Sequence, residues 1–185
     1  RFWDDDRFNH STQPVVGVSW YEAMAYCAWL TGVLRARPLA GGGIGLGEQV
    51  TLPSEVEWMA ATRSGRPAPK TQQEKSVDYP WHGPFATWRT NTEENEGTDL
   101  KQTSPVHMYP GGATAEGVYD LAGNVWEWTR DKNKDELYWL KGSSWYWSPD
   151  EARASARTIL VPRDRRFHGG FRVVVVPVSR MSPGS

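Results

Sequence analysis

The pattern of apolar and polar positions predicts a short strand followed by a helix near the start of the chain. Residues 15–18 are an apolar run interrupted by one glycine, which is typical of a short strand. Ser19 and Glu22 then form a capping box, so a helix is expected to begin here and to end at about Leu30. At helical spacing its apolar side chains share one face: Trp20, Ala23, Met24, Cys27 and Leu30.

The rest of the pattern predicts a second helix and two later strands, separated by long irregular stretches. Ser54 and Glu57 form another capping box, and the helix behind it should end at about Arg63. Residues 137–141 predict a strand, and the apolar run 170–176 predicts a closing strand at the centre of a sheet. Between these elements turn-forming residues dominate. Residues 1–13 are polar, and we expect them to be an irregular lead-in.

Composition places this chain among proteins with a single packed domain. With 185 residues it is long enough for one domain with a real core, and we treat residues 1–185 as that domain. The net charge of -1 argues against a nucleic-acid partner, and no stretch is long enough to span a membrane. A single cysteine, Cys27, excludes an internal disulfide and favours a reducing, cytoplasmic compartment; on the helix face it is expected to be buried.

Residues 117–129 combine oxygen-bearing side chains with a glycine and two tryptophans. Asp120, Asn124 and Glu127 carry oxygen atoms, and Gly123 allows a sharp turn that exposes main-chain carbonyls. Calcium takes several such oxygens from side chains and main chain together. A tight turn with acidic neighbours, leading into a buried tryptophan strand, explains the same residues without a metal.

Several short pieces in the same order resemble one known family. The pieces are PVVGVSW at 14–20, AYCAWL at 25–30, LPSEVEW at 52–58, YPWHG at 79–83, SPV at 104–106, GVYDLAGNVWEW at 117–128, KGSSW at 141–145 and GFRV at 170–173. They resemble the formylglycine-generating-enzyme type of C-type lectin fold, also called the sulfatase-modifying-factor domain. The resemblance implies an α+β, C-type lectin-like domain with two helices, a twisted antiparallel sheet and much irregular structure. It also implies that the family's first strands, upstream of Pro14, are missing and that the chain is a fragment.

The resemblance further implies two structural calcium sites. In the first site, Asp120 and Glu127 would contribute side chains, and Gly123 and Val125 would contribute carbonyls. The family often has Asn at the position of Asp120, and an aspartate still offers oxygen. In the second, weaker site the ligands would be Asn91 and Asp99, with carbonyls from Thr92 and Lys101.

The chemistry of the namesake enzymes is not expected in this chain. Those enzymes hold copper with a pair of cysteines in the segment corresponding to 145–169, and this segment has no cysteine. Neither tryptophan nor serine replaces a thiolate pair as a ligand of a cuprous ion. A second enzymatic branch uses nonheme iron and several histidines, whereas His10, His82, His107 and His168 are scattered along this chain. We therefore expect no copper and no oxidase activity.

The segment 145–169 instead resembles the variable region of proteins diversified by retroelements, which use the same fold. Scaffold-type residues there alternate with a mixed aromatic, aliphatic and basic set, and aromatic and arginine side chains are effective binding groups. The resemblance implies non-catalytic binding of a protein or other macromolecular ligand. The expected binding residues are Tyr146, Trp147, Ser148, Ile159, Leu160, Arg163, Arg166, Phe167 and His168.

Three alternatives stay open at this point. The aromatic residues of 145–169 could be core, as most large apolar side chains are. The chain could be an oxidase of the formylglycine-generating type, or it could be a sensor domain of a larger bacterial signalling or defence protein. Solvent exposure of the aromatic side chains distinguishes the first alternative from a binding surface.

Overall fold

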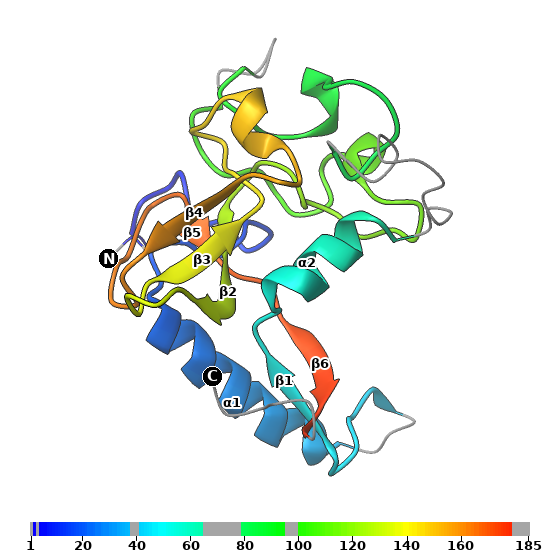
Figure 1. Ribbon diagram of the computed structural model, residues 1–185, viewed down its shortest axis with the longest axis vertical. Coiled ribbons are helices and arrows are strands. Elements are labelled where there is room, and N and C mark those ends of the chain that lie inside the picture. The colour runs from blue at the N-terminus through cyan, green and yellow to red at the C-terminus, as the bar shows by residue number, and fades with distance from the viewer. Residues whose placement is uncertain (1, 3, 38–40, 65–78, 95–99, 179–185) are drawn as a thin grey trace.

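The computed structural model describes residues 2, 4–37, 41–64, 79–94 and 100–178 and has an α+β architecture with two α-helices (Figure 1). The elements are α1 (Trp20–Arg35), β1 (Glu48–Thr51), α2 (Glu55–Thr62), β2 (Trp126–Lys132), β3 (Tyr138–Lys141), β4 (Arg157–Leu160), β5 (Gly169–Gly170) and β6 (Val174–Pro177), with short 3-10 turns at Thr87–Arg89, Pro110–Gly112 and Pro149–Ala152. Much of the described chain is irregular, as expected. No helix in these ranges combines the length and apolarity needed to cross a membrane.

The strands form two sheets. Four of them lie in the order β4–β3–β2–β5, and β1 pairs with β6 in a separate two-stranded sheet. The β2–β5 pair is parallel while the other pairs are antiparallel, so the larger sheet is mixed. In Figure 1, α1 runs past the lower edge of the larger sheet and beside β1, and α2 lies near the junction of the two sheets.

Both helices begin where their capping boxes predict. Ser19 and Ser54 each accept a hydrogen bond from the backbone N–H three residues on, and the glutamate at that position bonds back. Helix α2 ends at Thr62, close to the expected Arg63. Helix α1 continues to Arg35 instead of ending at Leu30, because its last turns still pack on the core, with Thr31 buried against β1.

Two predicted strands differ in the structure. Residues 15–18 form no strand, because the chain bends at Gly17, whose φ is 70°. Gly17 instead donates its N–H to the carbonyls of Arg166 and Gly169 at 3.0 and 3.1 Å. The run 170–176 is not one central strand, since it divides into the end of β5 and the separate β6, whose Val175 is exposed. A run of four valines has no alternation from which a buried face could be identified.

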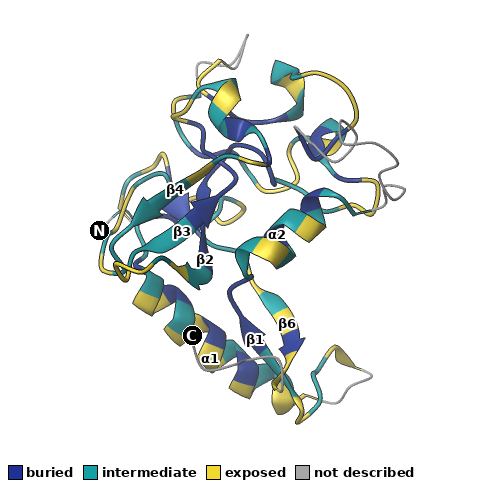
Figure 2. Ribbon diagram, in the orientation of Figure 1, coloured by how far each residue is buried: buried dark blue, intermediate teal, exposed yellow. Residues whose placement is uncertain are grey.

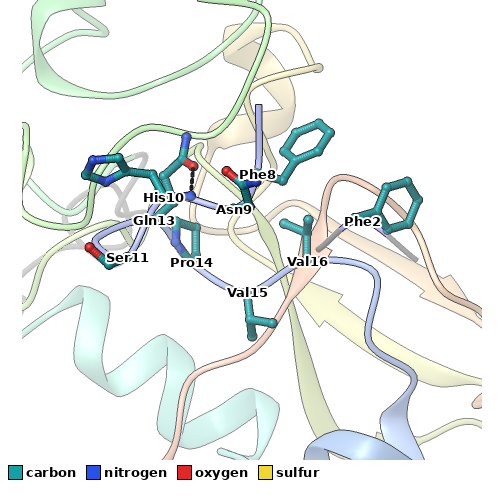
Figure 3. A pocket seen from close by; sticks show the side chains of 9 residues that line it. All are labelled: Phe2, Phe8, Asn9, His10, Ser11, Gln13, Pro14, Val15 and Val16. Atoms are coloured by element: carbon teal, nitrogen blue, oxygen red, sulfur yellow. Dashed lines mark hydrogen bonds between the residues drawn. The ribbon is translucent and has the colours of Figure 1, made fainter. Parts of the chain in front are cut away.

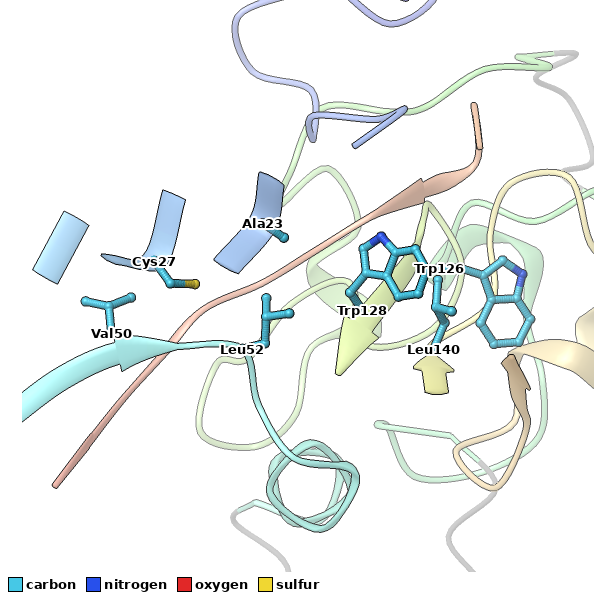
Figure 4. Packing of buried hydrophobic residues seen from close by; sticks show 7 residues of the cluster. All are labelled: Ala23, Cys27, Val50, Leu52, Trp126, Trp128 and Leu140. Atoms are coloured by element: carbon cyan, nitrogen blue, oxygen red, sulfur yellow. The ribbon is translucent and has the colours of Figure 1, made fainter. Parts of the chain in front are cut away.

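The principal core lies between α1, β1 and the larger sheet (Figure 4). Its fully buried members are Ala23, Cys27, Val50, Leu52, Trp126, Trp128 and Leu140. Cys27 is buried, which confirms the prediction from its helix face. The run 121–129, which includes the start of β2, is buried at every position and appears dark in Figure 2.

A second core brings the N-terminal residues under the 145–169 segment. Phe8 is buried with Val16, Val125 and Trp145, and Phe167 packs against this group. The polar lead-in predicted for residues 1–13 therefore contributes a core side chain. Figure 3 shows Phe8 and Val16 at a cavity of about 150 Å³ that is lined by side chains from residues 2–16.

Candidate functional site

Four side chains of the 145–169 segment form a continuous group, here called the aromatic cluster: Tyr146, Trp147, Phe167 and His168. The Tyr146 ring lies 5.4 Å from the Phe167 ring and 6.3 Å from the His168 ring, and Trp147 lies 6.3 Å from His168. Tyr146 is 55% exposed and Trp147 39% exposed. The cluster therefore presents two large aromatic side chains to solvent on a base of two half-buried rings.

The first half of the cluster is positioned by a tight turn after β3. Gly142 and Ser143 both have positive φ values, of 95° and 65°, and the chain bends there as it leaves β3. Trp145 then points into the second core, 6.1 Å from the Phe8 ring, while the next two residues point outward. Trp147 closes the turn by donating its N–H to the Ser144 carbonyl at 3.1 Å.

The second half of the cluster is positioned by close backbone approach. His168 accepts a hydrogen bond from the Trp126 N–H through its carbonyl at 2.8 Å. Gly170 follows, where a Cβ would collide with the Val15 carbonyl, so only glycine fits. Burial lowers the pKa of the His168 imidazole, which favours its neutral form, and its buried Nδ1 has no hydrogen-bond partner among the described residues.

The other predicted binding residues lie around the cluster or on the sheet. Ile159 and Leu160 are half-buried on β4, opposite Trp139 and Tyr138, and Leu160 packs against the principal core. Ser148 is half-buried at the N-cap of the 3-10 turn at Pro149–Ala152. The exposed basic residues are Arg163 and Arg166, and Arg166 pairs with Asp164 at 3.0 Å. The structure thus joins four of the nine predicted residues, and the binding role of all nine stays a prediction.

The loop at residues 120–127 is strongly turned and borders a cleft. Asp120, Gly123 and Asn124 have φ values of 57°, 76° and 65°, which lie in the left-handed region. Aspartate and asparagine tolerate this region better than most residues other than glycine. Asp120, Val125 and Glu127 all line a cleft of about 410 Å³. Three of the four predicted ligands of the first calcium site therefore face one cleft.

A guanidinium group already compensates part of the negative charge at this cleft. Arg172 donates a hydrogen bond from Nε to Glu127 Oε2 at 2.6 Å and another from Nη2 to Glu127 Oε1 at 2.7 Å. Its Nη2 also donates to the carbonyls of Tyr119 and Asp120. Trp58 donates its indole N–H to Glu127 Oε2 at 2.6 Å, so the Glu127 carboxylate has three hydrogen-bond donors.

The carboxyl group of Asp120 is compensated less directly than that of Glu127. Burial raises the pKa of its carboxyl above the usual value; the hydrogen bond from the His107 N–H and the Arg172 charge oppose this rise, and the nearby Glu127 charge adds to it. Two carboxyl groups, Asp120 and Glu127, therefore line this cleft with one guanidinium group, that of Arg172. Such a donor set fits a hard cation bound by two carboxylates and main-chain carbonyls. In the described ranges, no three side chains from His, Cys, Asp and Glu gather as a metal site.

The second predicted calcium site falls partly outside the described residues. Asn91 is buried; its Nδ2 donates to the Gln102 carbonyl at 2.9 Å, and its own carbonyl accepts the Asn124 N–H at 2.8 Å. Asp99 lies outside the described residues. The structure therefore places Asn91 beside the first loop but leaves the second site as a prediction.

The groups that would serve redox chemistry are dispersed. Burial raises the pKa of the only cysteine, Cys27, to about 11, so at neutral pH it is a thiol within the core. The histidines stand on separate segments: His10 and His82 are exposed, His107 contacts Tyr119, and His168 belongs to the cluster.

Sequence reasoning missed three residues that shape this region. Phe8 supports the cluster from below, 6.4 Å from the Phe167 ring, and an apolar residue in a polar lead-in was its only signal. Arg172 lies in the GFRV piece at 170–173, but nothing in the sequence indicates its partner Glu127. Lys141 is buried and donates to the carbonyls of Ala154 and Ala156, which no local pattern indicates.

Comparisons with known proteins place this chain in a family. The chain is 37% identical over 123 residues to the inactive C-alpha-formylglycine-generating enzyme 2 of Bos taurus, covering 63% of this chain and 32% of the relative. It is 33% identical over 135 residues to the formylglycine-generating enzyme of Mus musculus, covering 69% of this chain and 30% of that enzyme. The chain therefore spans about a third of the length of these relatives.

A solved structure gives the same fold. Treponema denticola variable protein 1 superimposes with a TM-score of 0.64 at 21% identity, over 92% of this chain and 73% of that one. At this identity the likeness shows the fold alone. The model of the sulfatase-modifying factor enzyme 1-like domain matches residues 4–177, and the chain belongs to this family.

Proposed function

We propose that this domain binds a macromolecular ligand without catalysis, through the aromatic cluster. The observation that carries the proposal is a contiguous group of rings whose outer members, Tyr146 and Trp147, are exposed while their neighbours are held in the second core. Exposed aromatic side chains on a rigid base lose little conformational entropy on binding and bury a large area. A protein or peptide ligand fits this chemistry best.

The residue inventory supports binding over oxidation. One buried cysteine cannot form a pair that holds copper, and its raised pKa disfavours the thiolate that a soft metal requires. The relatives include proteins named as active and as inactive enzymes, so the family alone does not decide. Turnover of a cysteine-containing peptide by the purified domain in the presence of copper would contradict a purely binding function.

The finer form of the proposal is that the cluster belongs to a diversified surface. Residues with structural roles, such as Trp145 and Gly170, alternate along the segment with exposed ones such as Tyr146 and Arg163. This arrangement allows the exposed side chains to change while the backbone is retained. Sequencing of sibling loci should then show adenine-templated changes at the exposed codons and none at the structural ones; a uniform segment would contradict it.

Calcium is proposed as a structural ion at the 120–127 loop. Asp120 and Glu127 would hold it with side chains, and Gly123 and Val125 with carbonyls. Support comes from the two carboxyl groups of Asp120 and Glu127, which line one cleft with a single guanidinium group, that of Arg172. The ion would supply a positive charge that stabilises the folded loop.

The proposed function is tested with matched pairs of exposed aromatic residues. Peptides selected from a random displayed library on the wild-type domain serve as the probe. Tyr146→Ala with Trp147→Ala should weaken peptide binding at least about tenfold, because the two outer rings of the cluster are removed. The control is Tyr26→Ala with Trp29→Ala, a ring pair 5.4 Å apart that is exposed on α1.

The control pair should bind the peptides as the wild type does. The proposal is wrong if the α1 pair abolishes binding while the cluster pair leaves it intact. Thermal unfolding of all three proteins verifies that neither double substitution acts by unfolding the domain.

A further inference from the structure

We infer that the turn at residues 123–126 holds the two halves of the aromatic cluster in register, and that Asn124 is the positioning residue through which it acts. The halves, at 146–147 and 167–168, are about twenty residues apart in sequence. Contacts with another segment of the fold must therefore fix their relative position. This inference deepens the proposed function and rests on it for the binding measurement, whereas its spectroscopic test stands alone.

The turn bonds directly to the backbone that carries the first half. Gly123 donates its N–H to the Gly142 carbonyl at 2.6 Å, and Trp145 donates its N–H to the Asn124 carbonyl at 3.1 Å. These two bonds lie at either end of the tight turn that points Tyr146 and Trp147 outward. A shift of the 123–124 backbone would therefore be transmitted to that turn.

The same few residues also hold the second half. Trp126 donates its N–H to the His168 carbonyl at 2.8 Å, and its ring lies 6.4 Å from the Trp147 ring. Val125 packs in the second core with Trp145, against which Phe167 also packs. Both halves of the cluster are thus hydrogen-bonded to residues 123–126 or packed against them, and these four residues are all buried.

Asn124 holds the turn in its conformation. Its φ of 65° lies in the left-handed region, which asparagine tolerates better than most residues. Its buried side chain bonds one residue in both directions: Oδ1 accepts the Ser104 N–H at 3.0 Å, and Nδ2 donates to the Ser104 carbonyl at 3.2 Å. A buried amide with all these bonds resists rotation.

A parallel support reaches the cluster through the 91–93 segment. Asn124 donates its N–H to the Asn91 carbonyl at 2.8 Å, and Glu93 donates its N–H to the Trp147 carbonyl at 3.1 Å. Both ends of this segment are therefore tied to the same turn and the same cluster. Release of Asn124 should loosen Trp147 by this route as well as through Trp145.

The test uses the domain labelled with 5-fluorotryptophan, with each resonance assigned by single tryptophan-to-phenylalanine substitution. Asn124→Ala removes both side-chain bonds and strains the positive φ, whereas Asn124→Gly removes the bonds but tolerates the conformation. Asn124→Ala should shift or broaden the fluorine resonances of Trp126, Trp145 and Trp147 while leaving Trp29 unchanged. Asn124→Gly should move the same three resonances by a smaller amount.

Thr31→Ala is the matched control, because Thr31 is also buried and bonds backbone on both sides, to Cys27 and Val50, but in the principal core. It should lower thermal stability and leave the Trp147 resonance in place. The inference is overturned if Asn124→Ala leaves the three resonances at their wild-type positions, or if Thr31→Ala moves them equally. If Asn124→Ala does not fold, Asn124→Gly decides alone: movement of the three resonances supports the inference and their constancy overturns it.

Peptide binding separates this inference from the proposed function. Asn124→Ala should also lose affinity for the selected peptides at least about tenfold, like the cluster variant, and Asn124→Gly should recover part of it. Unchanged affinity in Asn124→Ala, with the resonances moved, would overturn the binding consequence. If no peptide is selected on the wild type, the proposed function fails while the resonance shifts still establish the positioning role.

Discussion

At the scale of single residues, Lys141 is a charged side chain buried in the fold. It is 1% exposed, and its Nζ donates to the carbonyls of Ala154 and Ala156 at 2.8 and 2.7 Å. Glu55 lies 3.9 Å away, and the Trp58 ring 5.4 Å away. Burial lowers the pKa of the Lys141 ammonium to about 8, so the fold retains a charge at neutral pH that its surroundings only partly stabilise.

This pKa predicts a specific pH dependence. Because the folded-state pKa is depressed below the ordinary 10.5, the penalty for the buried charge is complete below pH 8 and disappears as the pH rises towards 10.5. Relative to Lys141→Met, the wild type should gain up to roughly 3 kcal/mol of unfolding free energy across that window. Urea titrations of both proteins at several pH values measure the difference.

Titration of Cys27 changes the stability in the opposite direction over an overlapping pH range. The effect of Lys141 is therefore measured as the difference between the wild type and Lys141→Met. Burial raises the pKa of its thiol to about 11, so the folded state loses stability as the pH rises from 9 to 11. Both proteins contain Cys27, and its contribution cancels in the comparison. A constant difference between wild type and Lys141→Met from pH 7 to 10.5 would contradict the assignment to Lys141.

At the scale of elements, the ion pair of Arg172 and Glu127 joins the chain between β5 and β6 to β2 and to the 119–120 backbone. Trp58 adds a bond from α2 to the same carboxylate. Three segments that are distant in sequence thus meet at one buried charge. A buried carboxylate that loses its partner is strongly destabilising, because its charge is then uncompensated.

Arg172→Met should therefore lower the unfolding free energy by about 3–5 kcal/mol, and Arg172→Lys, which keeps a charge, by less. Arg165→Met is the control, since Arg165 pairs with Glu22 at 2.9 Å on the surface and its loss should cost at most about 1 kcal/mol. Chemical denaturation of the three variants tests the order. Equal losses of unfolding free energy for Arg172→Met and Arg165→Met would show that the buried ion pair contributes no more to stability than the surface pair.

At the scale of the whole molecule, three buried clusters are joined by the run 121–129. Its residues belong to each of them: Trp126 and Trp128 to the principal core, Val125 to the second and Ala122 to the third, which also contains Tyr79 and Trp81. An ion that stabilised this run would therefore stabilise the domain as a unit. Its effect should appear in global unfolding, not only in the local loop.

The calcium proposal predicts that a chelator lowers the melting temperature of the domain. At a free calcium concentration of a hundred times the dissociation constant, bound calcium would contribute about 2.7 kcal/mol. Asp120→Ala should have a lower melting temperature and no response to the chelator, because a side-chain ligand is lost. Scanning calorimetry with and without chelator measures both effects, and a wild type that melts identically in both conditions excludes a stabilising calcium ion.

The sequence predicted well what depends on near neighbours. The capping boxes at Ser19 and Ser54 specify helix starts through atoms three residues apart, and both were confirmed. The end of α1 was wrong because Thr31 and the following turn are retained by contact with β1, not by local preference. The run 170–176 was wrong for the same reason, since pairing with β1 or β2 is decided by distant partners.

The candidate site divides in the same way. Its residue types were visible in the chain: Tyr146, Trp147, Phe167 and His168 were expected from the resemblance of 145–169 to a variable region, and the order of short pieces indicated the family and the fold. By itself the sequence determined these features because side-chain chemistry, local hydrogen bonds and family pattern are properties of neighbouring positions. Only the tertiary structure decided that Phe8 lies beneath the cluster, that Glu127 is paired with Arg172, and that Ile159 and Leu160 belong to the sheet. These outcomes depend on contacts between positions tens of residues apart, which form only when the whole chain packs.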